Sequence, residues 1–274
     1  MRPEHQTYER HRALVFDSGV GGLSVVGEIR NRLPDLALDY VADDAFRPYG
    51  EKSEAELTGR LPGLLATLAE MTSPDCIVIA CNTASVTALE VIRAEIDIPV
   101  IGVVPAIKPA AAWSRTGTIG VLGTPGTVRR KYVGGLIQHF AGDCQVVLQG
   151  SVNLVEMAER KLAGESIDLN DIRREIAPLF EGREGADIDA VVLACTHFPL
   201  LREDLQRAAR QTVRWIDSGA AIAKRVDVIL NSIEKQKRTV RADTAFLIGP
   251  VAETNRKAAF QSFGFDQIVG LVPG

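Results

Sequence analysis

The chain has 274 residues, of which 46% are hydrophobic and 24% charged, and its formal net charge is −4. These proportions are those of an ordinary globular protein, and the length allows one large or two smaller domains. The sequence has no basic block, so we expect neither nucleic acid nor an anionic membrane as a partner. Its apolar runs all stay shorter than the roughly 18 residues that span a bilayer.

Residues 1–12 are polar and charged, without the apolar core of a secretory signal, and we expect a flexible N-terminal tail there. The four cysteines, Cys76, Cys81, Cys144 and Cys195, include no C-x-x-C pair, and the four histidines lack metal-ligand spacing. The sequence therefore predicts no metal and a protein whose thiols stay reduced in the cytoplasm.

Short apolar runs alternate with helical stretches along both halves of the chain. The predicted strands of the first half are Ala13–Phe16, Leu38–Ala42, the run that begins at Cys76, and Pro99–Val104. Those of the second half are Thr118–Leu122, Cys144–Leu148, Ala190–Ala194 and Val213–Ile216. The helices expected with them include Ser24–Leu33, Ser53–Met71, Ala84–Glu95 and Ile222–Lys237. This alternation predicts an α/β fold with a doubly wound parallel sheet in each half.

The two halves resemble an ancient duplication, and we expect two pseudo-symmetric domains. After the tail over 1–12, the first α/β domain should comprise residues 13–108 plus 218–274, and the second residues 109–217. The strand Ala245–Ile248 is expected to return to the first domain.

The third strand of each half ends in a cysteine followed by hydrogen-bonding residues. The run that begins at Cys76 leads into Cys81-Asn82-Thr83, and Ala190–Ala194 leads into Cys195-Thr196-His197. One such cysteine alone would be read as packing, since free cysteines are often buried. Two at equivalent strand ends are better explained by function. Right-handed crossovers place the strand ends of a unit on one side, so two facing units would bring both thiols to one cleft.

Two thiols on opposite walls of a cleft can invert a stereocentre. One thiolate removes a proton from one face of a carbon, and the other thiol delivers a proton to the opposite face. A free thiol has a pKa of about 8.5, so it needs a partner near neutral pH, and Asp17 and His197 are the candidates. The turns after Cys81 and Cys195 could donate N–H groups to the developing charge. The sequence shows no clear phosphate cradle with a Schiff-base lysine, so we predict no cofactor.

Two loops of the first half could hold a small substrate. The glycine-rich turn that follows Asp17 resembles a phosphate cradle, but the carboxylate at its entrance suits an ammonium group better. The loop around Pro48-Tyr49-Gly50 also carries Arg47 and Lys52, which could bind a carboxylate. A solvated surface loop is the alternative interpretation.

Five blocks, in this order along the chain, resemble the signature of the glutamate racemase family, within the cofactor-independent aspartate/glutamate racemases. They are Asp17–Val25, Pro48–Gly50, Ala80–Ser85, Gly102–Ala106 and Cys195–Leu201. The resemblance covers roughly Ala13 to Ala223.

This resemblance implies two pseudo-symmetric domains with the site in the cleft between them, and interconversion of L- and D-glutamate for peptidoglycan synthesis. It implies that Cys81 is the base for D-glutamate, assisted by Asp17, and Cys195 the base for L-glutamate, assisted by His197. The positions that would hold substrate are Asp17, Ser18, Pro48, Tyr49, Gly50, Asn82, Thr83, Thr124, Thr127, Thr196 and His197.

The segment after Gly150 departs from the commonest pattern of the family, in which a proline-rich turn precedes a glutamate that assists the second cysteine. Here that proline is missing, and Glu159 is the expected equivalent, with Glu156 as the alternative. With its polar N-terminal extension, the chain resembles the branch of the family that responds to a cell-wall precursor nucleotide, which we expect as an activator. A homodimer remains open.

Three other functions remain open at this stage. A relative that racemises aspartate or a hydantoin would use both thiols in the same way. A binding or regulatory protein would hold an amino acid without turning it over, as some relatives that inhibit DNA gyrase suggest, but it would not need two thiols. A thiol hydrolase or redox protein would leave the second cysteine unexplained.

Overall fold

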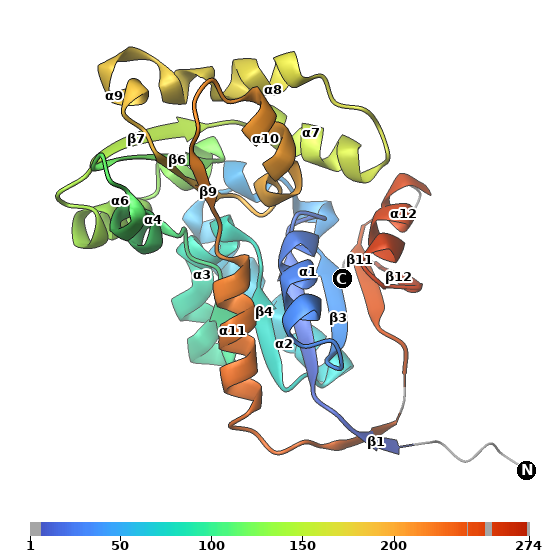
Figure 1. Ribbon diagram of the computed structural model, residues 1–274. Helices are drawn as coiled ribbons and strands as arrows, with labels where there is room; N and C mark the ends of the chain where they lie inside the picture. Colours follow the sequence, from blue (N-terminus) through green and yellow to red (C-terminus); the bar gives the residue numbers. More distant parts are fainter. Residues whose placement is uncertain (1–6, 240, 250–253, 273–274) are drawn as a thin grey trace, which may run out of the picture.

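The computed structural model describes residues 7–239, 241–249 and 254–272 and contains two parallel sheets, one above the other in Figure 1. The six-stranded sheet has the order β12-β11-β3-β2-β4-β5 and the four-stranded sheet the order β7-β6-β8-β9, with every pairing parallel. The predicted α/β class with two parallel sheets is confirmed.

The strands of the first sheet are β2 (Arg12–Asp17), β3 (Ala37–Ala42), β4 (Cys76–Ile79), β5 (Val100–Gly102), β11 (Thr244–Ile248) and β12 (Gln267–Leu271). Those of the second are β6 (Thr118–Gly123), β7 (Gln145–Gly150), β8 (Ala190–Ala194) and β9 (Arg214–Ile216). The order β3-β2-β4-β5 is repeated as β7-β6-β8-β9, which is the topology that a duplication would leave. In both sheets the order reverses beside the first strand, and open α/β sheets bind ligands at the carboxyl ends of the strands at such a point.

Helices cover both faces of each sheet. On the first sheet, α1 (Leu23–Arg32), α11 (Gly219–Leu230) and α12 (Thr254–Ser262) pack on one face, and α2 (Glu54–Thr72) and α3 (Asn82–Glu95) on the other. On the second, α7 (Asn153–Leu162), α8 (Leu169–Ile176) and α10 (Arg202–Ala208) lie opposite α4 (Ile107–Trp113), α5 (Pro125–Val128) and α6 (Lys131–Phe140). The remaining short elements are α9 (Gly182–Ala186), η1 (Asp44–Phe46), η2 (Tyr49–Glu51), η3 (Ala177–Phe180) and η4 (Phe198–Leu201). Burial on both faces explains why most of the strands read as continuous apolar runs.

The chain passes between the two sheets twice, after β5 and after β9. The hydroxyl of Ser218 donates a hydrogen bond to the carbonyl oxygen of Val104, so the two passages lie side by side. Strands β11 and β12 then join the first sheet. The domain boundaries at residues 108 and 217 stay a prediction.

Two predicted elements need correction. Part of the expected N-terminal tail is a strand, β1 (Thr7–Glu9), which pairs antiparallel with β10 (Lys237–Thr239); residues 1–6 lie outside the described residues. The helix expected over Ile222–Lys237 begins at Gly219 and ends at Leu230. Residues 231–236 contain no buried side chain, so nothing apolar holds that stretch against the sheet as a helix.

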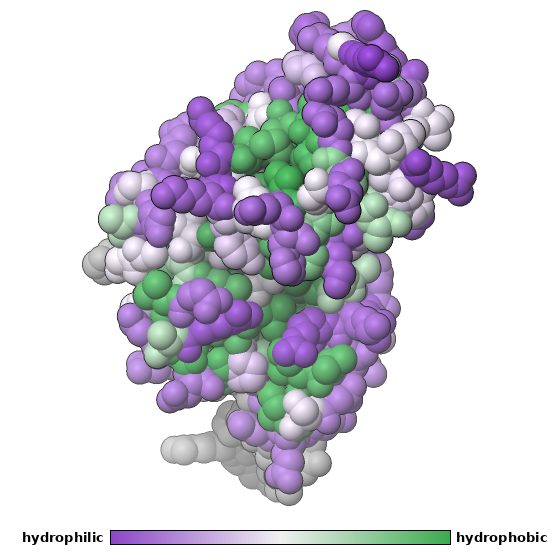
Figure 2. Space-filling model, turned by 90° about the vertical axis from the view of Figure 1, so that its left-hand side faces the viewer, coloured by the Kyte–Doolittle hydropathy of each residue, from purple (hydrophilic) through white to green (hydrophobic). Residues whose placement is uncertain are grey.

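The surface mixes apolar and charged side chains, as Figure 2 shows for one face, where apolar areas are rimmed by hydrophilic residues. The exposed large apolar side chains include Tyr132, Phe140, Leu148 and Val152. Among the described residues, no helix has the length and apolar character needed to cross a membrane.

Candidate active site

A cleft lies where the points at which the strand order reverses in the two sheets face each other. Asp17 ends β2, Cys81 follows β4, Thr124 follows β6 and Cys195 follows β8. The cavity between these strand ends has a volume of about 560 Å³. Its walls include the predicted residues Ser18, Pro48, Tyr49, Gly50, Cys81, Asn82, Thr83, Thr124, Thr127, Glu159, Cys195, Thr196 and His197. Both thiols therefore border one space, at the end of equivalent strands.

Cys81 is the N-cap residue of α3. Its sulfur accepts a hydrogen bond from the N–H of Ala84 at 3.5 Å and lies 3.6 Å from the hydroxyl of Ser18. A helix N-terminus favours a thiolate. Here, however, burial and then the charge of Asp17 raise the pKa of Cys81 to about 12. Without substrate, Cys81 is therefore a neutral thiol at pH 7.

Asp17 lies behind Cys81 and is fully buried, so it does not line the cavity. Its carboxylate accepts a hydrogen bond from the N–H of Gly22 at 2.6 Å, and the hydroxyl of Tyr40 lies 3.5 Å from the same oxygen. Burial raises the pKa of Asp17, while the charge of His197 opposes that shift. A carboxyl group of raised pKa next to a thiol can take up a proton from it, which fits the expected assistance.

Cys195, His197 and Glu159 form a chain on the opposite wall. The Cys195 sulfur lies 3.8 Å from Nδ1 of His197, and Nε2 of His197 lies 3.5 Å from Oε1 of Glu159. Burial alone would lower the pKa of His197, but its contacts with Cys195 and Glu159 raise it to about 10. His197 is thus a cation at neutral pH, and its Nδ1 faces the sulfur of Cys195.

Glu159 and its alternative, Glu156, differ in position. Glu159 reaches the cavity and contacts His197, whereas Glu156 is exposed and does not line the cavity. Burial opposes the charge on Glu159, yet His197 and Arg47 together lower its pKa to about 2. The geometry favours Glu159 as the glutamate that orients the histidine.

Hydroxyl and amide groups from both sheets meet across the floor of the cavity. The Thr127 hydroxyl lies 2.9 Å from the hydroxyls of both Thr83 and Thr124. Asn82 has a buried side-chain oxygen without a hydrogen-bond partner among the described residues. A ligand with an ammonium group could satisfy that oxygen, because buried polar atoms rarely stay without a partner.

The Pro48-Tyr49-Gly50 loop is held from behind by a buried carboxylate. Asp43 accepts a 2.6 Å hydrogen bond from the hydroxyl of Tyr49 and two 2.8 Å bonds from Arg60 of α2. Of the two cations expected on this loop, Arg47 lies in the cavity wall but pairs with Glu159. Lys52 lies over the ring of Phe46 and does not line the cavity.

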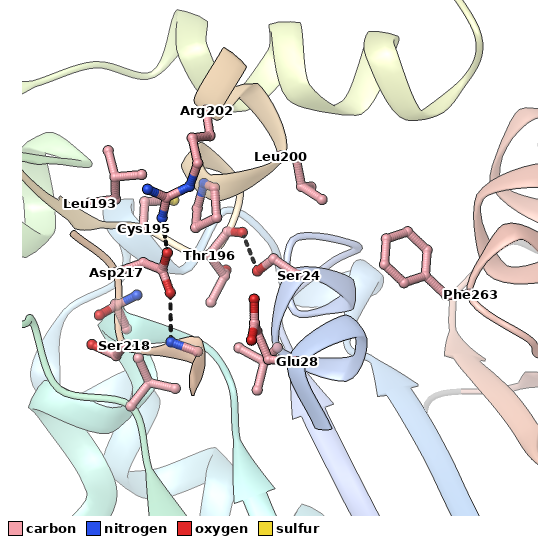
Figure 3. A pocket seen from close by; sticks show the side chains of 15 residues that line it. Ser24, Glu28, Leu193, Cys195, Thr196, Leu200, Arg202, Asp217, Ser218 and Phe263 are labelled. Carbon is pink, nitrogen blue, oxygen red and sulfur yellow. Dashed lines mark hydrogen bonds and ion pairs between the residues drawn. The ribbon is translucent and has the colours of Figure 1, made fainter. Parts of the chain in front are cut away.

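Sequence reasoning missed the residues that join the two walls from behind. The hydroxyl of Ser24 donates a 2.7 Å hydrogen bond to the carbonyl oxygen of Thr196, as Figure 3 shows in a second cavity of about 220 Å³. Gly21 packs so closely on the ring of His197 that a Cβ there would overlap it. Both residues lie inside the first signature block, but only the fold shows which strand end they face.

The model of the Asp/Glu/Hydantoin racemase family matches residues 23–226. The chain belongs to this family. It is an amino-acid racemase, and the resemblance to glutamate racemase that its motifs indicated is confirmed by its relatives.

The glutamate racemase of Escherichia coli O157:H7 is 44% identical to this racemase over 263 residues, which are 96% of this chain and 92% of the relative. A crystal structure of Escherichia coli glutamate racemase, in complex with L-glutamate and the activator UDP-MurNAc-Ala, matches with a TM-score of 0.89 and 42% identity, over 96% of this chain and 98% of that one. A glutamate racemase isoform of Bacillus anthracis matches with a TM-score of 0.79 and 26% identity, over 97% and 98%.

Proposed function

We propose that this racemase interconverts L- and D-glutamate by a two-base mechanism without pyridoxal phosphate, in which one of Cys81 and Cys195 removes the α-proton and the other delivers a proton to the opposite face. The observation that carries the proposal is the pair of thiols at equivalent strand ends, both bordering one cavity and each with its own acid–base partner. The similarity to glutamate racemases supports glutamate as the substrate, ahead of aspartate or a hydantoin.

In the direction from L- to D-glutamate, the Cys195 thiolate takes the α-proton and the Cys81 thiol supplies a proton to the opposite face. The sulfur of Cys195 is then protonated and that of Cys81 is ionised. The reverse reaction starts from this second state, in which Asp17 is the group placed to exchange a proton with Cys81. The resting arrangement, with a neutral Cys81 and a cationic His197, is poised for L-glutamate.

The other polar residues of the cavity are suited to different groups of the substrate. Ser18 and Asn82 suit the ammonium group, and the hydroxyls of Thr83, Thr124 and Thr127 suit a carboxylate. The N-terminus of α3 lies at Cys81, so its N–H groups face the charge that develops on the α-carbon and its carboxylate.

Proton exchange in deuterated water tests the proposal. Purified protein without added cofactor is incubated with L- or D-glutamate, and the α-proton signal is followed by NMR together with the other enantiomer. We expect the signal to be lost from both enantiomers. If only aspartate exchanges its α-proton, aspartate is the substrate instead of glutamate. If neither amino acid exchanges, an amino-acid-binding protein becomes the favoured interpretation.

We also infer that a cell-wall precursor nucleotide activates this racemase. The structure of the Escherichia coli relative contains UDP-MurNAc-Ala, and that chain is 42% identical to this one. Activation by the precursor is expected in an assay with saturating glutamate. An unchanged racemisation rate at a ten-fold excess of precursor over protein would exclude it.

The expected product, D-glutamate, would be used for peptidoglycan. We place the reaction in the cytoplasm, because the mechanism needs free thiols and all four cysteines are free. A homodimer stays a prediction.

A further inference from the structure

Four charged side chains meet along one side of the cleft: Asp44, Arg47, Glu159 and Arg256. Arg47 places Nη1 2.8 Å from both carboxylate oxygens of Glu159, and Nη2 of Arg256 lies 3.6 Å from Oε2 of the same group. Glu159 belongs to α7, which packs on the second sheet, whereas the other three come from segments of the first sheet. The four residues therefore join the two units across the cleft.

Asp44 orders the two arginines of this cluster. Nε of Arg47 lies 2.8 Å from Oδ1 of Asp44, and Arg256 forms an ion pair with the same oxygen. The side chain of Arg47 is 35% exposed and that of Glu159 24%, so water screens their attraction less than at an open surface. A guanidinium fixed in this way is already oriented for Glu159, which lowers the entropy lost when the units meet.

The same carboxylate contacts the acid–base pair of the second unit. Oε1 of Glu159 lies 3.5 Å from His197, whose other nitrogen faces Cys195, and Asp17 faces the histidine from the first sheet. Helix α7 and the η4 segment after His197 pack together on the second sheet. If the units separate, Glu159 therefore keeps His197 and loses its two arginines.

We propose that Arg47 is a positioning residue, which fastens the two units through Glu159 and so links closure of the cleft to the charge around His197. The inference rests on the proposed racemase mechanism and extends it. Removing this cation would open the cleft more often, and it would raise the pKa of the titratable groups near Glu159 because a positive charge is lost.

Thiol labelling of the substrate-free protein tests the closure directly. Cys81 and Cys195 are 6% and 7% exposed, so iodoacetamide should modify both slowly. In Arg47→Met we expect both to react about ten-fold faster, as for a cleft that has lost a partly buried ion pair, and in Arg47→Lys by less. Loss of the positive charge alone would leave less thiolate and slow the reaction, so labelling that stays at the wild-type rate or slows at both cysteines would overturn the proposal.

Arg32→Met is the matched control, since Arg32 pairs with Asp227 at 2.7 Å between α1 and α11, which both cover the first sheet. That variant also loses one arginine ion pair, but not one between the units. Its labelling rates should equal those of the wild type. Acceleration equal to that of Arg47→Met would assign the effect to general destabilisation and would also overturn the proposal.

Kinetics provide the second measurement. We expect Arg47→Met to lower kcat/KM about ten-fold and to move its pH profile to higher pH. Because the two enantiomers have equal free energies, kcat/KM must fall equally in both directions, which checks the data. Unchanged labelling and an unchanged profile would overturn the role of Arg47 alone, whereas a wild type that exchanges no α-proton would overturn the proposed function.

Discussion

Cys81 and Cys195 face opposite charges, although they occupy equivalent strand ends. Cys81 lies beside the carboxylate of Asp17, and its pKa is raised to about 12, first by burial and then by that charge. Cys195 lies 3.8 Å from His197, whose pKa is raised to about 10. The duplicated fold therefore carries two chemically different walls, which suits a reaction that removes a proton on one face of a carbon and delivers another on the opposite face.

Replacing either thiol should abolish racemisation. Cys81→Ala and Cys195→Ala each remove the base of one direction and the acid of the other. Racemisation of L- and of D-glutamate, followed by circular dichroism, should fall to background in both variants. Either variant with more than about a tenth of wild-type activity, a loss below roughly 1.4 kcal/mol of transition-state stabilisation, would contradict the two-base mechanism.

The charge on Glu159 should make the free energy of unfolding depend on pH in the acid range. Its pKa in the folded protein is about 2, below the ordinary value of about 4.3, mainly because His197 and Arg47 outweigh the effect of burial. The stabilisation is therefore complete above about pH 4.3 and is lost as the pH falls toward 2, as the sign of the shift requires. We expect Glu159→Gln to be less stable than the wild type at pH 6, on the order of 2 kcal/mol, with the difference shrinking by pH 3.

Urea unfolding at pH 6, 4 and 3 measures this difference. Glu156→Gln is the control, since Glu156 is exposed and lies three positions earlier on the same helix. A difference between Glu159→Gln and the wild type that stays constant with pH would show that the effect is one of packing rather than of charge.

The sequence could place the two thiols, because an apolar run that ends in a cysteine is a local pattern, and it occurs twice. It could not choose between Glu156 and Glu159, which are neighbours on one helix. That choice depends on which of them faces His197, on another element. The pairing of Arg47 with Glu159 likewise joins residues 112 positions apart in the chain, which no local pattern indicates.

Helix α2 holds the Pro48-Tyr49-Gly50 loop through one arginine. Arg60 donates two 2.8 Å hydrogen bonds to Asp43, whose carboxylate has no solvent exposure. The same carboxylate also accepts a hydrogen bond from the hydroxyl of Tyr49. Arg60→Met would leave this charge buried without its cation. We expect a loss of about 3 kcal/mol in unfolding free energy and a higher KM for glutamate, because the loop at Tyr49 is released.

A double variant separates charge from packing. Adding Asp43→Asn to Arg60→Met removes the buried charge, so part of the stability should return while KM stays high. If the double variant is less stable than Arg60→Met by the full cost of a second independent mutation, the charge of Asp43 was not the cause.

Prediction of the elements succeeded where burial left a strong local pattern. Ala190–Ala194 was predicted with its observed bounds, since both of its faces are covered. Strand β12 was not predicted: it is an edge strand, and its apolar run over residues 268–272 is short, only partly covered and interrupted by Gly270. The pairing of β1 with β10 was missed because each has three residues and needs the other end of the chain.

Two passages of the chain and a few contacts decide how the two sheets and their helices meet. The passages lie side by side at Val104 and Ser218, on one side of the interface. The backbones approach closely at Gly126 of the second unit, where a Cβ would overlap the carbonyl oxygen of Gly50. This approach brings the Tyr49 loop against the turn that carries Thr124 and Thr127.

Gly126→Ala should therefore hold the units apart without unfolding either one. The added methyl group meets a backbone atom, which cannot rotate away as a side chain would, so we expect kcat/KM to fall about ten-fold or more and the unfolding free energy to change by less than about 1 kcal/mol. Gly134→Ala, in α6 of the same unit, is the control, since its Cβ would meet nothing within 4 Å and should stabilise the helix by about 0.5–1 kcal/mol.

Comparing the activities of the two glycine variants tests whether the reaction needs the closed cleft. If Gly126→Ala loses activity while Gly134→Ala keeps it, and both unfold cooperatively near the wild-type midpoint, the contact between Gly126 and Gly50 belongs to the reactive state. Full activity in Gly126→Ala would mean that the cleft works in a more open form. The thiols would then have to transfer protons across a wider and wetter space, where the backbone N–H groups at Cys81 stabilise the developing charge less.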